Sequence, residues 1–390
     1  MKKKDQNPPP KPSPREGRVN GDGPDENPPK ILNRLKAAQD SEVLECRYYF
    51  GLRYLSGQGV PQEHALAVKW FRLAAEGGHA AASHKLGVML SGGLGTAQDD
   101  SEALKWFRFA ADQGTPESAF MLGMMLLQGR GGPGNEQEGE DRIRQAAEQG
   151  IKQAQFLLGF MHNYGQVAPF DLAEAAKWYR LAAEQGHPRA RYNLGNMLKN
   201  GYGVPQDEVE AKKWYRLAAE QGLPEAQYKL GLSLAETAKD RLPDAEVLKW
   251  FRLAAEGGET RAQLIFGLMC KLGLGVRQDD LEAVKWFRAA AERGFAMAKF
   301  NLAIMYENGL GVPQDLAEAR KWHLQAAKQG ESRSMLKLAD MYENGLGVPK
   351  DADESAKWRE LAREREDSAP RKDFDNFIEL IKTRPGAWKH

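Results

Sequence analysis

The stretch ARYNLGNMLKNGYGVPQDEVEAKKWYRLAAEQG, residues 190–222, contains the pattern that decides the fold. Tryptophan recurs at multiples of 36 residues, with Arg142 at the one position where it is missing, and a glycine recurs at the same interval. These residues are Trp70, Trp106, Trp178, Trp214, Trp250, Trp286, Trp322 and Trp358, and Gly78, Gly114, Gly150, Gly186, Gly222, Gly258, Gly294 and Gly330. A constant period over most of a chain predicts stacked structural repeats.

Each repeat is predicted to contain two helices. The second helix begins after an acidic or polar residue such as Asp207, and Glu210 three positions later completes the pattern of a capping box. It ends at a glycine such as Gly222, which can adopt the left-handed conformation that terminates a helix. The first helix carries a Leu-Gly pair such as Leu194 and Gly195, in which the glycine lets a neighbouring helix approach. A Gly-x-Gly turn joins the two helices.

Nine such units fit between residues 43 and 366. A single hairpin cannot bury its apolar face, so the units must stack into an all-α, right-handed α-solenoid with a concave inner wall. Residues 31–42 are predicted to form an N-terminal capping half-repeat, and residues 367–390 a C-terminal capping helix and tail, since Phe374, Phe377, Ile378 and Ile381 have helical spacing. Residues 1–30 contain the proline-rich run Pro8–Pro14 and few apolar side chains, which predicts a disordered tail.

The order Ala, LG, Tyr or Met, GxGV, Asp, Ala, KW[YF], AA and Gly in residues 190–222 closely resembles the Sel1-like repeat, a relative of the tetratricopeptide repeat. The resemblance covers all nine units. It implies a non-catalytic scaffold or adaptor that binds one or more proteins and needs no cofactor. A cysteine-rich bacterial branch of the family, some of whose members bind β-lactams, has paired cysteines in each repeat, and this sequence lacks those pairs.

Composition limits the partners and the compartment. Lys and Arg total 55 against 54 Asp and Glu, so we expect no binding to nucleic acid. No run of about 18 apolar residues occurs, so we expect no membrane insertion. The two cysteines, Cys46 and Cys270, lie in positions that we expect to be buried, and so few cysteines favour a reducing compartment. With no signal peptide, a cytoplasmic location is expected. Specialised secretion, as a bacterial effector or host-entry factor that binds host proteins, stays an alternative.

Three motifs resemble sites of chemistry. Residues Gly129–Gly134 match GxGxxG, but a helix is expected before them where a dinucleotide fold needs a strand. Ser334 and Lys337 match SxxK without the SDN and KTG elements, so a β-lactam-binding or hydrolytic enzyme is the least favoured alternative. His79 and His84 are the only close histidine pair, and neither HExxH nor CxxC occurs, so we expect no metal. We therefore predict no catalytic residue.

A column of residues on the first helices is the predicted partner-binding site. By analogy with tetratricopeptide repeats, the first helices line the inner wall, and the residue after each LG pair faces a partner. The column is Leu52, Val88, Met124, Phe160, Asn196, Leu232, Leu268, Ile304 and Asp340. Its mainly apolar character predicts a hydrophobic groove for a partner helix or extended segment. The alternative is that these side chains pack against the adjoining helix. Two repeats depart from the pattern: repeat three, which has Arg142 in place of Trp, and repeat six, which has an irregular turn at residues 236–244. These departures are either functional sites or the result of neutral drift.

Overall fold

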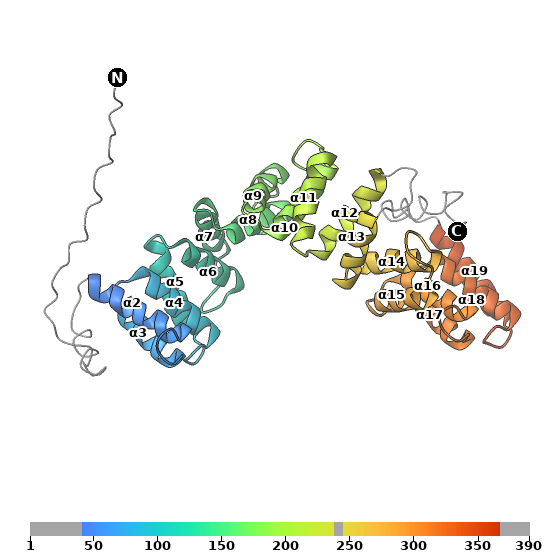
Figure 1. Cartoon of the computed structure of the whole chain (residues 1–390), viewed down its shortest axis with the longest axis horizontal. Helices are drawn as coiled ribbons and strands as arrows, with labels where there is room; N and C mark the ends of the chain where they lie inside the picture. The colour runs from blue at the N-terminus through green and yellow to red at the C-terminus, as the bar shows by residue number, and fades with distance from the viewer. Residues whose placement is uncertain (1–40, 238–244, 367–390) are drawn as a thin grey trace, which may run out of the picture. The chain divides into compact units, whose positions relative to one another are not determined.

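The computed structural model describes residues 41–237 and 245–366 (Figure 1). Within these ranges the regular secondary structure is helical throughout, in nine consecutive helix pairs. The helices are α2 (Ser41–Ser56), α3 (His64–Glu76), α4 (Ala80–Gly92), α5 (Asp100–Asp112), α6 (Pro116–Gln128), α7 (Glu136–Glu148), α8 (Lys152–Tyr164), α9 (Leu172–Glu184), α10 (Pro188–Asn200), α11 (Glu208–Glu220), α12 (Pro224–Thr237), α13 (Ala245–Glu256), α14 (Thr260–Leu272), α15 (Asp280–Glu292), α16 (Ala296–Asn308), α17 (Leu316–Lys328), α18 (Ser332–Asn344) and α19 (Ala352–Glu366). The predicted all-α repeat fold is confirmed.

The chain divides into two compact units, Met1–Asn135 and Glu136–His390. The first unit contains α2 to α6 and the second contains α7 to α19. Within each unit, each helix packs against the neighbouring helices of that unit in the sequence. This arrangement of neighbours is that of an α-solenoid, in which one hairpin buries its apolar face against the next.

The predicted helix starts are correct, but only half of the capping box forms. Six N-cap aspartates accept a hydrogen bond from the backbone N–H three residues later, at 2.8–3.0 Å. They are Asp99, Asp171, Asp207, Asp279, Asp315 and Asp351. The backbone N–H of Asp207 donates to the carbonyl of Leu198 in the preceding helix at 2.9 Å, and the other five repeat this bond. The glutamate of the motif is therefore free to bind other groups.

The repeated tryptophans pack and also use that glutamate. Trp70 and Trp250 are buried, and the other six are half-buried. In Trp106, Trp214, Trp250 and Trp286 the indole N–H donates to the carboxylate four residues earlier, at 2.9–3.4 Å. Each of these bonds joins the first turn of a second helix to its middle.

The Leu-Gly pairs let the two helices of a hairpin meet closely. A Cβ on Gly195 would lie 2.7 Å from the ring of Tyr215, which is fully buried in the second helix of the same hairpin. The same fit recurs at Gly51, Gly87, Gly159, Gly231 and Gly267, each facing Phe or Tyr. Repeats eight and nine carry alanine at this position, and there His323 and Arg359 stand in place of Phe or Tyr. In six hairpins, glycine at this position therefore makes room for the ring of Phe or Tyr.

The small residues four positions before each leucine are fully buried in eight repeats, at Ala82, Ser118, Ala154, Ala190, Ala226, Ala262, Ala298 and Ser334. Cys46 occupies the same position in repeat one but is exposed, so its predicted burial is wrong. It lies on α2, which no earlier described helix covers. Cys270 is buried as predicted, and burial raises the pKa of its thiol to about 11.

Some predictions concern residues outside the described ranges. These are the tail 1–30, most of the half-repeat 31–42, the C-terminal cap 367–390 and most of the irregular turn of repeat six. Residues 41 and 42 of the predicted half-repeat belong to α2. None of the helices in residues 41–237 and 245–366 is long and apolar enough to span a lipid bilayer.

Candidate functional site

Each predicted column residue lies on the first helix of its hairpin, directly after the LG pair or its variant. Their exposure differs although their positions are equivalent. Val88 is exposed, Leu232 is buried, and the other seven are half-buried, namely Leu52, Met124, Phe160, Asn196, Leu268, Ile304 and Asp340. Leu52, Val88 and Met124 belong to the first unit and the others to the second. Leu232 therefore has almost no surface to offer a partner.

Two apolar members of the column also stabilise the fold. Phe160 packs against the buried core that extends from α9 to α13, and Leu268 packs against the core between α12 and α16. The ring of Phe160 also lies 4.5 Å from that of Tyr164, one turn further along α8. A charge at either column position would thus disturb packing as well as the accessible surface.

The two polar members are each bound by the second helix of their own hairpin. The hydroxyl of Tyr215 donates to Oδ1 of Asn196 at 2.8 Å. Arg359 donates to Oδ1 of Asp340 at 3.0 Å and also pairs with Glu343. Repeats five and nine therefore interrupt the apolar column with anchored polar groups.

A set of contacts that the sequence did not predict fixes four of the first helices, α8, α10, α12 and α14, against the preceding repeat. The side-chain amide of Gln227 donates to the carbonyl of Ala219, near the end of α11, at 3.1 Å. Gln155, Arg191 and Gln263 make the equivalent bond over the same eight-residue spacing, at 3.0–3.1 Å. Gln155, Gln227 and Gln263 are buried. These bonds satisfy carbonyls at a helix end and hold the column at a regular spacing.

Ion pairs join consecutive second helices. Three arginines bind the capping glutamate of the next repeat, in the pairs Arg72–Glu102, Arg180–Glu210 and Arg216–Glu246. In each pair the bound guanidinium is the main reason that the pKa of the glutamate is below its usual value. These arginine charges are consequently neutralised, in agreement with the balanced composition.

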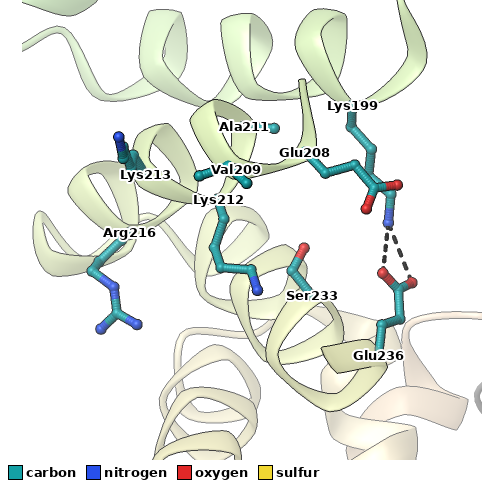
Figure 2. Close-up of a pocket in the computed structure, with 9 residues that line it drawn as sticks. All are labelled: Lys199, Glu208, Val209, Ala211, Lys212, Lys213, Arg216, Ser233 and Glu236. Carbon is teal, nitrogen blue, oxygen red and sulfur yellow. Dashed lines mark hydrogen bonds and ion pairs between the residues drawn. The ribbon is translucent and has the colours of Figure 1, made fainter. Parts of the chain in front are cut away.

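A pocket of about 490 Å³ lies between α10, α11 and α12 (Figure 2). Lys199 at the end of α10 donates to both carboxylate oxygens of Glu236 on α12, at 3.2 and 3.1 Å. The other lining residues are Glu208, Val209, Ala211, Lys212, Lys213, Arg216 and Ser233, so basic groups outnumber acidic ones. Neither Asn196 nor Leu232 of the column lines it, and no sequence motif marked it.

The SxxK motif does not form a reactive site. Ser334 is fully buried and bonds to Nδ1 of His323 at 3.2 Å. Lys337 instead pairs with Glu307 at 2.9 Å. Nε2 of His323 lies 3.6 Å from the other oxygen of Glu307, and these contacts hold the pKa of that carboxyl at about 2. Since Ser334 has no exposed surface, this Ser, His and Glu arrangement offers no nucleophile to a substrate.

The other two motifs have structural positions. Gly129 ends α6 in the left-handed conformation, so a helix and not a strand precedes the GxGxxG match. His79 caps α4 by accepting the backbone N–H of Ala82 at 3.1 Å, whereas His84 bonds to Ser118 at 2.8 Å. No group of three or more His, Cys, Asp or Glu side chains that could hold a metal ion occurs in the described part of the chain.

Comparison with known proteins gives a consistent match. The sequence profile described as "Sel1 repeat" matches residues 44–79, 80–115, 116–151, 152–187, 188–223, 224–246, 248–259, 260–295, 296–331 and 332–367. The only break within a repeat falls in the sixth, between residues 246 and 248. No curated protein matches the chain.

Two solved structures are similar to this chain over long stretches. A protective antigen of uropathogenic Escherichia coli strains, with an SLR fold, is 29% identical with a TM-score of 0.61, and the match covers 92% of this chain and 88% of that chain. A Sel1 repeat protein from Oxalobacter formigenes is 32% identical with a TM-score of 0.53, and the match covers 65% of this chain and 99% of that one.

Proposed function

Because the chain belongs to the Sel1 repeat family, we propose that it is a non-catalytic cytoplasmic scaffold that binds partner proteins along its first helices and needs no cofactor. Stacked hairpins present equivalent side chains at a regular spacing, which suits them to bind long or multiple segments of other proteins. The two cysteines are unpaired, in keeping with a reducing compartment.

The observation that carries this proposal is the partial exposure of the column. Apolar residues such as Met124 and Ile304 retain accessible surface on the first helices of stacked hairpins. Apolar anchors on a rigid surface supply most of the binding free energy at protein interfaces. Leu232 is not part of the proposed surface because it is buried.

The test replaces Val88 and Ile304 separately by Glu and measures recovery of co-purifying proteins by quantitative mass spectrometry. Leu281→Glu is the matched control, since Leu281 is an exposed aliphatic residue on a second helix, away from the column. We expect each column variant to lose a partner about tenfold or more, and the control to keep it. Far-UV circular dichroism should show unchanged helicity. If both folded column variants keep every partner, the partner-binding surface lies elsewhere.

A second candidate function is that of a bacterial effector or host-entry factor that binds host proteins. The similarity to the protective antigen of uropathogenic Escherichia coli strains favours it. Both candidates use a binding surface, so location separates them. Detection of the chain in the culture medium of intact cells would support the second candidate, and its restriction to the cytosolic fraction would support the first.

A further inference from the structure

The turn between α8 and α9 differs from the other described turns at three positions. Tyr164, Val167 and Phe170 stand there, and the equivalent residues of repeat five are Asn200, Gly203 and Gln206. Three polar or small positions have thus become apolar within one turn. Stacking does not require the change, because neighbouring repeats pack with the ordinary residues.

All three side chains are exposed, and they lie within seven residues of one another in the sequence. Tyr164 is 60% exposed, Val167 41% and Phe170 65%. Tyr202, 55% exposed, belongs to the next turn, and that turn lies against the start of α9, since a Cβ on Gly203 would overlap the carbonyl of Leu172. We call Tyr164, Val167, Phe170 and Tyr202 the aromatic patch. Single exposed apolar residues are ordinary, but several gathered together indicate a binding surface.

The backbone at Val167 is strained. Its φ of 69° makes it the one residue other than glycine with positive φ in residues 41–237 and 245–366. The N–H of Ala168 donates to the carbonyl of Gln166 at 2.8 Å and closes a three-residue turn around it. Glycine occupies the equivalent position in the neighbouring turns. A β-branched residue is costly in this conformation, so we infer that the exposed side chain of Val167 has a use that offsets the strain.

The helix that contacts this turn, α7, begins with a run of acidic residues. Nδ1 of His162 bonds to the carbonyl of Pro169 at 2.9 Å, and Nε2 lies 3.5 Å from Arg144 on α7, which pairs with Glu140. These contacts join the turn to α7, whose first six residues, EQEGED, include four acidic and no basic side chains. Glu136 and Asp141 are exposed. The turn itself, residues 164–171, contains Asp171 and no lysine or arginine.

We propose that the aromatic patch and the acidic start of α7 form a docking site for an extended, positively charged segment of a partner protein. Arginine or lysine side chains would stack on the rings of Tyr164 and Phe170 and pair with the carboxylates of α7. The fold already stacks arginine on aromatic rings, as Arg333 does on Phe300 at 4.5 Å. This inference rests on the proposed scaffold function but uses mainly the turn after α8, which adjoins the column where the ring of Tyr164 contacts that of Phe160.

The test selects random displayed peptides on the full chain and, in parallel, on a variant with Tyr164→Asn, Val167→Gly and Phe170→Gln. The variant carries the residues of repeat five and removes the positive φ of Val167, so it is expected to fold. Peptides enriched on the natural chain alone should be rich in Lys or Arg. A synthetic consensus peptide should bind the triple variant about tenfold or more weakly by fluorescence anisotropy, and added salt should weaken its binding to the natural chain.

A second variant, Glu136→Gln with Asp141→Asn, should bind the same peptide more weakly, although its aromatic rings are unchanged. Ile304→Glu, on the column, should bind it with unchanged affinity. An acidic or uncharged consensus, equal binding by the triple variant, or the absence of patch-dependent peptides would overturn the inference. Loss of partners from Ile304→Glu alongside any of these results would leave the proposed scaffold function standing.

Discussion

Replacing Gly195 by Ala tests whether the facing aromatic ring requires glycine in the first helix. The added Cβ would lie 2.7 and 2.8 Å from two ring carbons of Tyr215 and 3.3 Å from the carbonyl of Ala211. The ring cannot easily withdraw, because Tyr215 is fully buried and its hydroxyl is bonded to Asn196. Overpacking costs about 1–3 kcal/mol, and alanine regains about 1 kcal/mol of helix propensity. We expect a net loss of up to about 2 kcal/mol in the free energy of unfolding.

The partner residue should decide the size of this loss. Repeat eight carries Ala303 together with His323, a smaller ring, in place of the glycine and six-membered ring of repeat five. In a chain that already contains Tyr215→His, Gly195→Ala should therefore cost much less or become stabilising. The two substitutions should show a favourable coupling of about 1 kcal/mol or more.

Urea unfolding followed by far-UV circular dichroism measures all four proteins of this cycle. The control is Gly92→Ala, a helical glycine whose added Cβ would meet nothing within 4 Å. That change should stabilise the chain by about 0.5–1 kcal/mol. The packing argument is refuted if the effects at Gly195 and Tyr215 add within about 0.5 kcal/mol, or if Gly195→Ala stabilises the natural chain.

Three further predictions concern stability. Gln227→Leu should lower the free energy of unfolding by about 1 kcal/mol, because the side chain loses its hydrogen bond to the end of α11. Gln227→Arg, which copies Arg191, should retain most of the stability. Equal thermal unfolding midpoints of the two variants would contradict this prediction. Glu307 has its pKa lowered to about 2, mainly by His323, so its contribution is complete above about pH 4.5 and is lost as the pH falls toward 2. In the natural chain, loss of this contribution should lower the free energy of unfolding by on the order of 2 kcal/mol between pH 5 and pH 3, and Glu307→Gln should abolish that part of the fall. Urea unfolding at the two pH values measures it, and an equal fall in both proteins would count against the prediction. Val167→Gly should raise stability by about 1 kcal/mol, measured as a higher thermal midpoint, because the positive φ no longer carries a side chain.

The repeat fold could be predicted from sequence because its rules are local. A constant 36-residue period, an acidic N-cap and a terminal glycine each depend on a few neighbouring residues, and the helix ends lie where these signals place them. The second half of the capping box was predicted wrongly because a carboxylate such as Glu102 has several competing partners. It binds Trp106 and Arg72 of the previous repeat, and local spacing does not rank such partners.

The candidate site was less predictable because burial depends on neighbouring repeats. Val88 and Leu232 occupy equivalent sequence positions, yet one is exposed and the other buried. Cys46 is exposed for the same kind of reason, since a packing position needs a neighbour to be buried. The glutamine contacts had a usable signal, a Gln or Arg eight positions after the last alanine of four consecutive second helices. The aromatic patch had one as well, in the three replaced turn residues.

The short sequence separation of the stabilising contacts affects how the chain can fold during synthesis. The bond of Gln227 to Ala219 spans 8 residues of sequence, and the ion pair between Arg180 and Glu210 spans 30. Such short-range connections favour rapid folding. A polypeptide leaving the ribosome can therefore form the contacts of one hairpin as soon as the next hairpin has emerged, before the C-terminus is synthesised. We expect the repeats to fold one after another during synthesis, so that little hydrophobic surface is exposed to aggregation at any time.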